Sequence, residues 1–246
     1  MSNYIIDINA DVGEGQNNEA LLMPFLSSCN IACGGHAGDI QSMTDVVRLA
    51  KEYKVKIGAH PSFPDRTNFG REVMAMSAAD LYSTLKQQIR DLQHVLYTEN
   101  TQLHHIKPHG ALYNLAAKDK KTADVVIEVL KSIALPIQLY APYQSVLANR
   151  AEDENIKVTY EGFADRNYNE DLSLVSRKNS KAILSDKRKI LTHLIEMIKH
   201  ENVLTLNAKK VPFKASTFCV HGDTKNAIEI LRFLSTELPK HNIKIQ

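Results

Sequence analysis

The chain has 246 residues, of which 43% are hydrophobic, and a formal net charge of +2 at pH 7. This length suits one α/β barrel, and the scattered basic residues argue against the one-sided positive surface of a nucleic-acid-binding protein. No apolar run approaches the roughly 18 residues of a membrane span, and the first residues have no secretory signal pattern. We therefore expect a cytoplasmic protein, with one domain over residues 1–246, that acts on a small molecule or another protein.

Short apolar runs alternate with amphipathic stretches, which is typical of βα units and a mainly parallel sheet. The expected strands cover residues 4–8, 27–31, 55–59, 103–107, 136–140, 157–160, 203–206 and 217–220. The expected helices cover residues 43–53, 78–97, 122–133, 143–152, 186–198 and 226–237. In the clearest helix, leucine and isoleucine recur at helical spacing behind Ser77, which can cap the first turn.

Seven or eight mostly parallel strands predict a barrel rather than an open sheet. An open sheet that binds a dinucleotide would carry a G-x-G-x-x-G turn after its first strand, and the sequence has none there. Polar turns follow the strands at residues 7–14, 30–39, 58–71, 107–114, 163–166 and 220–223. Since parallel barrel strands all end at one face, where active sites are built, the sequence predicts that these turns share one pocket.

The first strand places polar side chains where a barrel interior is normally apolar. Asp7, Asn9 and Asp11 alternate along the chain and should point to the same side. Buried polar groups are costly unless they are paired, so a ligand, a metal or a hydrogen-bonded core network must satisfy them. Glu14 follows, and it either contacts a ligand or simply opens the next helix.

Three histidines and one lysine stand in the other polar turns. Gly34 lets the backbone near His36 approach a ligand, while His60 and His109 follow two further strands. Histidine can move protons near neutral pH, and Lys107 at the barrel mouth can stabilise negative charge that develops on an oxygen. We predict catalytic roles for these four residues and for Asp11, with structural roles as the alternative.

Arginine side chains in the turns can form paired hydrogen bonds with a carboxylate or a phosphate. Arg66 or Arg71 is therefore expected to hold an anionic group of the substrate, although Arg71 could instead form a surface ion pair. Three cysteines do not suggest a disulfide framework and are expected to be small packing residues. The predicted substrate contacts are Asn9, Glu14, Asn30, Gly34, Ser62, Arg66, Arg71 and Arg166.

Taken in order, the segments 7–14, 30–39, 58–71, 107–114, 163–168 with 172–177, and 220–223 resemble the LamB/YcsF family over almost the whole chain. The resemblance implies a distorted β/α barrel similar to those of glycoside hydrolases and polysaccharide deacetylases. It also implies ATP-dependent opening of 5-oxo-L-proline to L-glutamate together with 5-oxoprolinase subunits B and C. The partners would activate the lactam carbonyl by phosphorylation and handle most of the ATP, which agrees with the absence of a Walker-type loop in this sequence.

Hydrolysis of a lactam needs an activated carbonyl, a water nucleophile and a proton for the leaving nitrogen. The expected base is Asp11 or His36, and the expected proton donor is His109 or His60. Lys107 would stabilise the negative charge.

A catalytic metal is left open at this point. Asp11, His36 and His60 would form an Asp-His-His set like that of deacetylases with a similar fold, which suits Zn²⁺ and other divalent ions. However, the histidines lie on separate turns and lack the close spacing of a recognisable motif. The alternatives are a stand-alone metal-dependent deacetylase or amidohydrolase and a non-catalytic barrel that stabilises the partner subunits.

Overall fold

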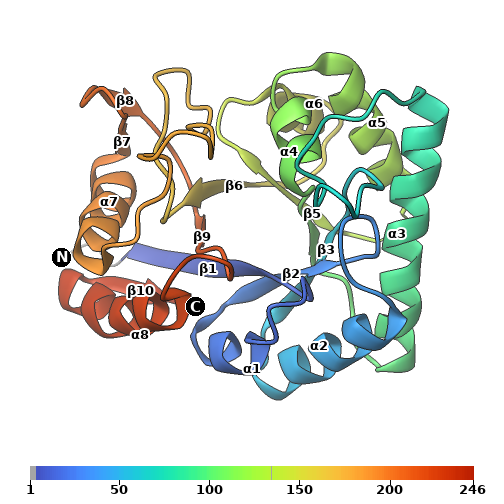
Figure 1. Cartoon of the computed structure of the whole chain (residues 1–246), viewed down its shortest axis with the longest axis horizontal. Helices are drawn as coiled ribbons and strands as arrows, with labels where there is room; N and C mark the ends of the chain where they lie inside the picture. The colour runs from blue at the N-terminus through green and yellow to red at the C-terminus, as the bar shows by residue number, and fades with distance from the viewer. Residues whose placement is uncertain (1–3, 134) are drawn as a thin grey trace.

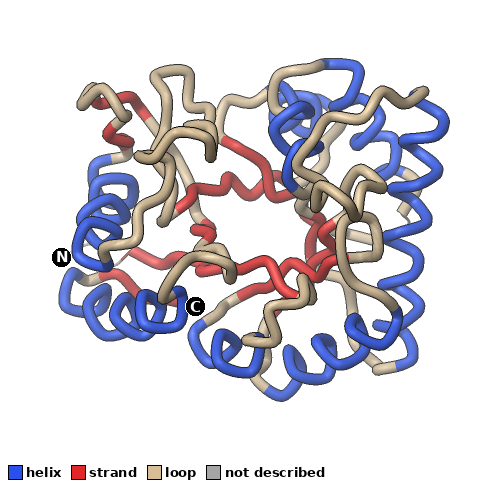
Figure 2. The backbone as a smooth tube through the Cα atoms, in the orientation of Figure 1, coloured by secondary structure: helices blue, strands red, loops and turns tan. Residues whose placement is uncertain are grey.

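Seven parallel strands close into a barrel in the order β1-β2-β3-β4-β5-β6-β9, with β9 hydrogen-bonded back to β1. The computed structural model describes residues 4–133 and 135–246. The barrel strands are β1 (Tyr4–Val12), β2 (Ser28–Ala32), β3 (Lys56–His60), β4 (His105–Ile106), β5 (Gln138–Pro142), β6 (Val158–Phe163) and β9 (Thr217–Cys219). Figure 2 shows these strands as a ring with the helices outside it. The barrel predicted from the sequence is thereby confirmed.

Helices cover the outer wall of the barrel (Figure 1). The α-helices are α1 (Glu19–Leu22), α2 (Ile40–Glu52), α3 (Ala78–Thr98), α4 (Gly110–Ala116), α5 (Lys120–Lys131), α6 (Val146–Asp153), α7 (Lys187–His200) and α8 (Ala227–Glu237), and 3-10 helices span Met23–Phe25 and Leu238–His241. Ser77 caps α3 as predicted, because its side chain accepts a hydrogen bond from the backbone N–H of Asp80. The sequence analysis missed the short helices α1 and α4. Within the described residues, every helix is too short or too polar to cross a bilayer.

One predicted barrel strand is wrong. Residues 203–206 do not enter the barrel, since Asn202–Leu204 forms β7 and pairs antiparallel with β8 (Lys210–Pro212) in a separate hairpin. A further strand that the sequence analysis missed, β10 (Ile243–Ile245), pairs in parallel with the start of β1. Strands of three residues carry too little periodicity to distinguish a barrel strand from a hairpin strand.

The barrel interior is hydrogen-bonded rather than filled only by aliphatic side chains. Asp11 lies beside Asn30 in the β1–β2 register, Asn30 beside Gly58, and Gly58 beside His105. A Cβ atom on Gly58 would lie 2.1 Å from His105 Nε2, so glycine leaves the space that the imidazole occupies. His105 uses that space to donate a hydrogen bond of 2.7 Å to Asn30 Oδ1. A chain of polar contacts therefore runs across the barrel wall just below the mouth.

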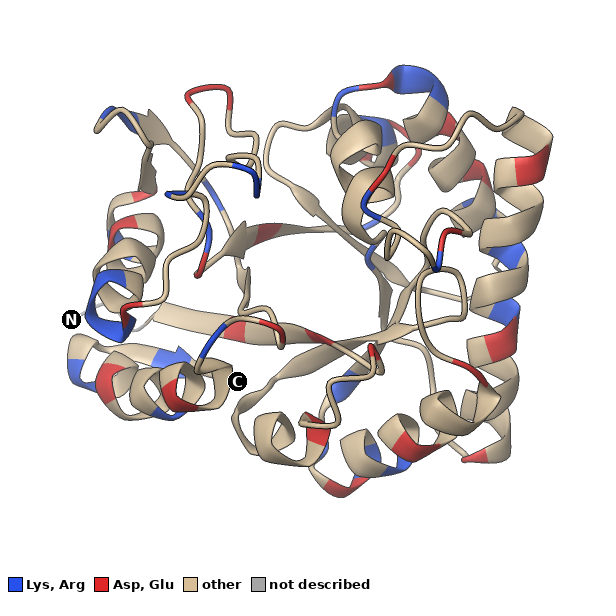
Figure 3. Ribbon diagram, viewed as in Figure 1, with Lys and Arg blue, Asp and Glu red and all other residues tan. Residues whose placement is uncertain are grey.

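Charges of both signs are interspersed over the outer helices in the view of Figure 3. Some of them pair with each other: Lys120 Nζ lies 2.6 Å from Asp124, and Arg150 Nε lies 2.7 Å from the same residue. A mixed surface of this kind differs from the one-sided positive surface that nucleic-acid binding uses.

Candidate active site

A cleft of about 960 Å³ lies at the ends of the barrel strands. The polar turns after β1, β3, β4 and β9 all reach it, although they are far apart in the chain. This convergence is the geometry that parallel barrel strands produce. The predicted site residues that line the cleft are Asp11, Glu14, His60, Arg71, Lys107, His109 and Arg166.

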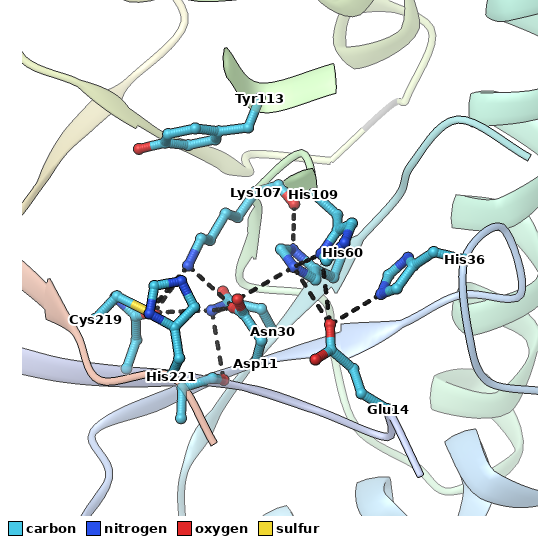
Figure 4. Close-up of polar contacts among 12 residues, drawn as sticks. Asp11, Glu14, Asn30, His36, His60, Lys107, His109, Tyr113, Cys219 and His221 are labelled. Atoms are coloured by element: carbon cyan, nitrogen blue, oxygen red, sulfur yellow. Dashed lines mark hydrogen bonds and ion pairs between the residues drawn. The ribbon is translucent and has the colours of Figure 1, made fainter. Parts of the chain in front are cut away.

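Lys107 occupies the centre of the site (Figure 4). Its side chain is buried, and Nζ lies 3.0 Å from Asp11 Oδ1, 2.8 Å from Glu161 Oε1 and 3.3 Å from Cys219 Sγ. Burial alone would lower the pKa of Lys107, but the surrounding negative groups, above all Asp11, outweigh burial and raise the pKa well above its usual value. Lys107 is therefore a fixed positive charge and is suited to stabilise an anion rather than to exchange a proton.

Asp11 connects the lysine to the histidines. Its Oδ1 accepts hydrogen bonds from Lys107 and from Asn30 Nδ2, while Oδ2 lies 3.4 Å from His60 Nε2. Burial would raise the pKa of Asp11, but the neighbouring His60 and the Lys107 ammonium outweigh burial and hold this pKa well below its usual value. Asp11 is thus an ionised carboxylate that holds Lys107 in place and is a weak base.

Glu14 and three histidines form a cluster beside Asp11. Glu14 Oε1 lies 2.9 Å from His36 Nε2, 3.4 Å from His109 Nδ1 and 3.9 Å from His60 Nε2. Burial lowers the pKa of His36 to about 3 and moves the pKa of His109 well below its usual value. Burial likewise raises the pKa of Glu14. The rings of His36 and His109 are therefore neutral at physiological pH.

His221, which pairs with the buried Asp165, lies on the other side of the site from His60 and His36 (Figure 4). His221 lines the cleft, and its Nδ1 donates a hydrogen bond of 2.9 Å to Asp165 Oδ1. A ligand atom of His221 also lies within 4.8 Å of one from Asp11 and one from Cys219. A buried carboxylate that orients an imidazole in this way is typical of a histidine that moves protons.

The sequence analysis named the turns that contain Asp165 and His221 but did not assign these residues to the site. It missed Glu161 entirely. Glu161 is buried on β6, where it receives hydrogen bonds from Asn9 Nδ2 at 3.0 Å and from the Tyr113 hydroxyl at 2.8 Å. The only available signal was a carboxylate directly after the strand expected at residues 157–160.

Several predicted site residues lie outside the cleft: Asn9, Asn30, Gly34, His36, Ser62 and Arg66. Asn9 and Asn30 are fully buried, and Asn30 Nδ2 donates a 2.8 Å hydrogen bond to Asn9 Oδ1. These two residues therefore belong to the core network that the sequence analysis kept as the alternative. Their contact with substrate stays a prediction.

The other outlying residues have local partners. The Ser62 hydroxyl donates to the Phe63 carbonyl, and the exposed Arg66 guanidinium donates to the carbonyl of Gly38. Gly34 has a φ of +94°, a backbone conformation that favours glycine. These contacts explain the turn geometry without a ligand.

The arginines at the cleft differ in the partners that hold their guanidinium groups. Arg71 Nη2 lies 2.8 Å from Asp223 Oδ2, and Arg177 Nη1 lies 3.3 Å from the same oxygen. Arg166 is buried and donates to the Val175 carbonyl at 2.7 Å. Arg71 and Arg177 therefore form a positive pair at the cleft, while Arg166 mainly fixes the loop beside it.

Comparison with known proteins places the chain in one family. The sequence model of the LamB/YcsF family matches residues 6–246. The A subunit of a 5-oxoprolinase from Haemophilus influenzae (strain PittEE) is 40% identical over 240 residues, covering 98% of both chains. Its namesake from Clostridium beijerinckii is 38% identical over 247 residues, covering 98% of this chain and 97% of the relative.

Solved structures agree with this result. A lactam utilization protein from Thermus thermophilus superposes with a TM-score of 0.91 at 32% identity, covering 98% of each chain. A GH18 chitinase from Pseudoalteromonas aurantia reaches a TM-score of 0.53 at 11% identity over 94% of this chain and all of its own, which shows a likeness of fold alone. The resemblance found in the sequence is confirmed, and the chain belongs to the LamB/YcsF family.

Proposed function

We propose that this chain opens the ring of 5-oxo-L-proline to L-glutamate as the A subunit of an ATP-hydrolysing 5-oxoprolinase, acting with subunits B and C. Relatives that bear this name align with nearly the whole chain. The observation that carries the proposal is the buried Lys107 ammonium between Asp11 and Glu161 at the cleft. Amide hydrolysis develops negative charge on an oxygen, and a preorganised cation in a water-poor site stabilises such charge.

The cleft suits a small anionic substrate. The carboxylate of 5-oxoproline can pair with Arg71 or Arg177, each of which uses one guanidinium nitrogen on the same oxygen of Asp223. The volume of about 960 Å³ lies at the upper end of the range for small-molecule sites. A lactam ring alone leaves much of that space free, and a phosphoryl group on the activated carbonyl oxygen would fit beside it.

Ring opening of the phosphorylated lactam requires that a water oxygen bond to the ring carbon, that the C–N bond break and that the nitrogen gain a proton. A second water then releases the phosphoryl group as inorganic phosphate and leaves the glutamate carboxylate. Lys107 stabilises the oxygen that becomes negative, and Asp11 and Glu161 hold Lys107 in position. His221 is the best-placed proton carrier, because its Nδ1–H is held by Asp165 and Nε2 remains to accept or deliver a proton.

The partner subunits supply the activation step in this proposal. Transfer of the γ-phosphoryl group of ATP to the lactam oxygen makes the ring carbon more electrophilic, so a weakly basic site can complete hydrolysis. An ATP-dependent reaction also fits the cytoplasmic setting expected from the sequence.

Reconstitution of the purified chain with subunits B and C tests the proposal. The mixture should convert 5-oxoproline and MgATP to glutamate, ADP and inorganic phosphate, and omission of any one component should stop glutamate formation. A surface variant, Lys120→Met, serves as the matched control for Lys107→Met. If this chain alone, without ATP, forms glutamate or hydrolyses another amide, the result would instead support a stand-alone amidohydrolase.

A further inference from the structure

Two buried histidine nitrogens face each other at the cleft. His109 Nδ1 lies 2.9 Å from His60 Nε2, and the two rings are nearly perpendicular, with an interplanar angle of 87°. Such a separation normally means that one nitrogen donates a hydrogen to the other. In a neutral ring, whether the facing nitrogen carries a hydrogen depends on the second nitrogen of the same ring.

Backbone carbonyls fix the tautomer of both rings. His60 Nδ1 lies 2.7 Å from the carbonyl oxygen of Lys107, and His109 Nε2 lies 2.9 Å from that of Phe69. A carbonyl oxygen only accepts hydrogen bonds, so both of these nitrogens must carry the hydrogen. If both rings are neutral, His60 Nε2 and His109 Nδ1 are both bare, and two lone pairs meet at 2.9 Å, with the Asp11 Oδ2 oxygen also 3.4 Å from His60 Nε2. A cation between them would turn this repulsive contact into a favourable one.

Glu14 supplies a third donor atom to the same point. Its Oε1 lies 3.4 Å from His109 Nδ1 and 3.9 Å from His60 Nε2. Ligand atoms about 2.0–2.1 Å from a tetrahedral Zn²⁺ lie roughly 3.3–3.5 Å from each other. The three separations of 2.9, 3.4 and 3.9 Å span that value. A shared proton would link only the two histidine nitrogens, whereas a metal ion can also bind the oxygen of Glu14.

His36 belongs to the cluster but is not suited to bind the same ion. Its ring is stacked on that of His109 with centroids 3.6 Å apart and 3° between the planes. Lone pairs lie in the ring planes, so two parallel rings cannot both aim at one ion. His36 Nε2 lies 2.9 Å from Glu14 Oε1, and no carbonyl in the described residues holds its Nδ1. His36 therefore donates from Nε2 and fixes the Glu14 carboxylate.

A second group of possible ligands, Asp11, Cys219 and His221, is a poorer cation site. The Lys107 ammonium already lies 3.0 Å from Asp11 and 3.3 Å from Cys219. Like charges at such short range repel strongly in a buried environment. The Lys107 charge thus leaves the Glu14 cluster as the better place for an added cation.

We propose that Glu14, His60 and His109 bind one divalent transition-metal ion, with Zn²⁺ the best match, and that His36 positions Glu14. Two imidazoles and a carboxylate suit Zn²⁺ and its neighbours, and a carbonyl that orients each ligating ring is the usual support around such a site. The three ligating residues line the cleft and His36 does not, so the ion would face the substrate. There it would act as a Lewis acid toward an oxygen of the substrate.

Metal binding by the purified full chain tests the proposal without any substrate. After treatment with a chelator and dialysis, the chain is given Zn²⁺ or Co²⁺, and bound metal, affinity and thermal unfolding are measured. The wild type should retain one ion per chain and unfold at a higher temperature with metal. Glu14→Gln and His109→Gln should weaken binding by more than about 100-fold, whereas His36→Ala should weaken it about 10–100-fold and keep the one-ion stoichiometry.

Two control variants separate this site from other histidines. His94→Ala removes an exposed imidazole on α3, and His221→Ala removes a residue of the second group; both should bind the ion like the wild type. If His109→Gln fails to fold, Glu14→Gln at the partly exposed edge gives the same test. A wild-type chain that binds no ion would overturn the proposal and indicate a proton between His60 and His109. Loss of the ion in His221→Ala, or its retention in Glu14→Gln, would also overturn it. Because these measurements use no substrate, they would stand even if the ring-opening function were refuted.

Discussion

Replacement of Lys107 by methionine tests how far the site depends on one buried charge. The ammonium lies 3.0 Å from Asp11 and 2.8 Å from Glu161, and the side chains of these acids are only 8% and 0% exposed. Removing one partner of a buried ion pair costs about 3–5 kcal/mol, because the remaining charge has neither water nor a counterion. Lys107→Met should therefore lower the free energy of unfolding by about that amount and abolish ring opening.

A double-mutant cycle separates the lost charge from a lost packing contact. Glu161→Gln combined with Lys107→Met removes one of the two uncompensated carboxylates at nearly constant shape, so the double variant should be more stable than Lys107→Met alone. Urea unfolding gives the coupling energy, which for neighbouring groups reaches about 0.5–3 kcal/mol. Activity should stay lost in the double variant. Additive effects of the two substitutions on stability, or full activity of Lys107→Met, would refute this account.

Further predictions concern the proton carrier, the barrel wall and the pH dependence of folding. His221→Gln should slow glutamate formation in the reconstituted enzyme by about 10²–10⁴-fold with little change in stability, and an unchanged rate would assign the proton to another group. Gly58→Ala would place Cβ 2.1 Å from His105 Nε2 and should cost about 1–3 kcal/mol in urea unfolding; a neutral effect would show that the imidazole has room to move. Burial lowers the pKa of His193 from 6.5 to about 4, so the neutral ring stabilises the fold fully above pH 6.5 and less as the pH falls toward 4. Between pH 7 and 5 this group should account for about 2 kcal/mol of lost stability, and His193→Leu should show a correspondingly smaller loss, which thermal unfolding at both pH values measures.

The barrel and the convergence of its turns could be predicted because both follow from the order of elements. Asp11, His60 and Lys107 stand at or directly after apolar strands, and parallel strands deliver such residues to one face. Strand β7 could not be placed in the same way, because a short apolar run is compatible with a hairpin as well as with a barrel.

Pairings between distant residues were the part that the sequence could not supply. Glu161 is far from Lys107 along the chain, and only the closed barrel brings its carboxylate to 2.8 Å from the ammonium. The orientation of the histidine rings could not be predicted either. The sequence suggested Asp11, His36 and His60 as a metal set. In the structure, His36 is stacked on His109, and Glu14 joins the cluster. Side-chain direction in a turn depends on contacts from other turns, and no local pattern records them.

Two groups of polar side chains with different chemical properties flank Lys107 in this barrel. On one side lies the Glu14 carboxylate with His60 and His109, the set proposed to hold a cation, and on the other lies His221, which Asp165 holds and which is proposed to move a proton (Figure 4). Lys107 keeps the two sides apart, because its positive charge occupies the place beside Asp11 and Cys219 where a second cation would otherwise bind. Electrophilic activation and proton transfer can then act on opposite sides of one substrate. A barrel filled with aliphatic side chains could not hold these charges, so the buried network of Asn9, Asn30 and Glu161 is the structural condition for the chemistry at the mouth.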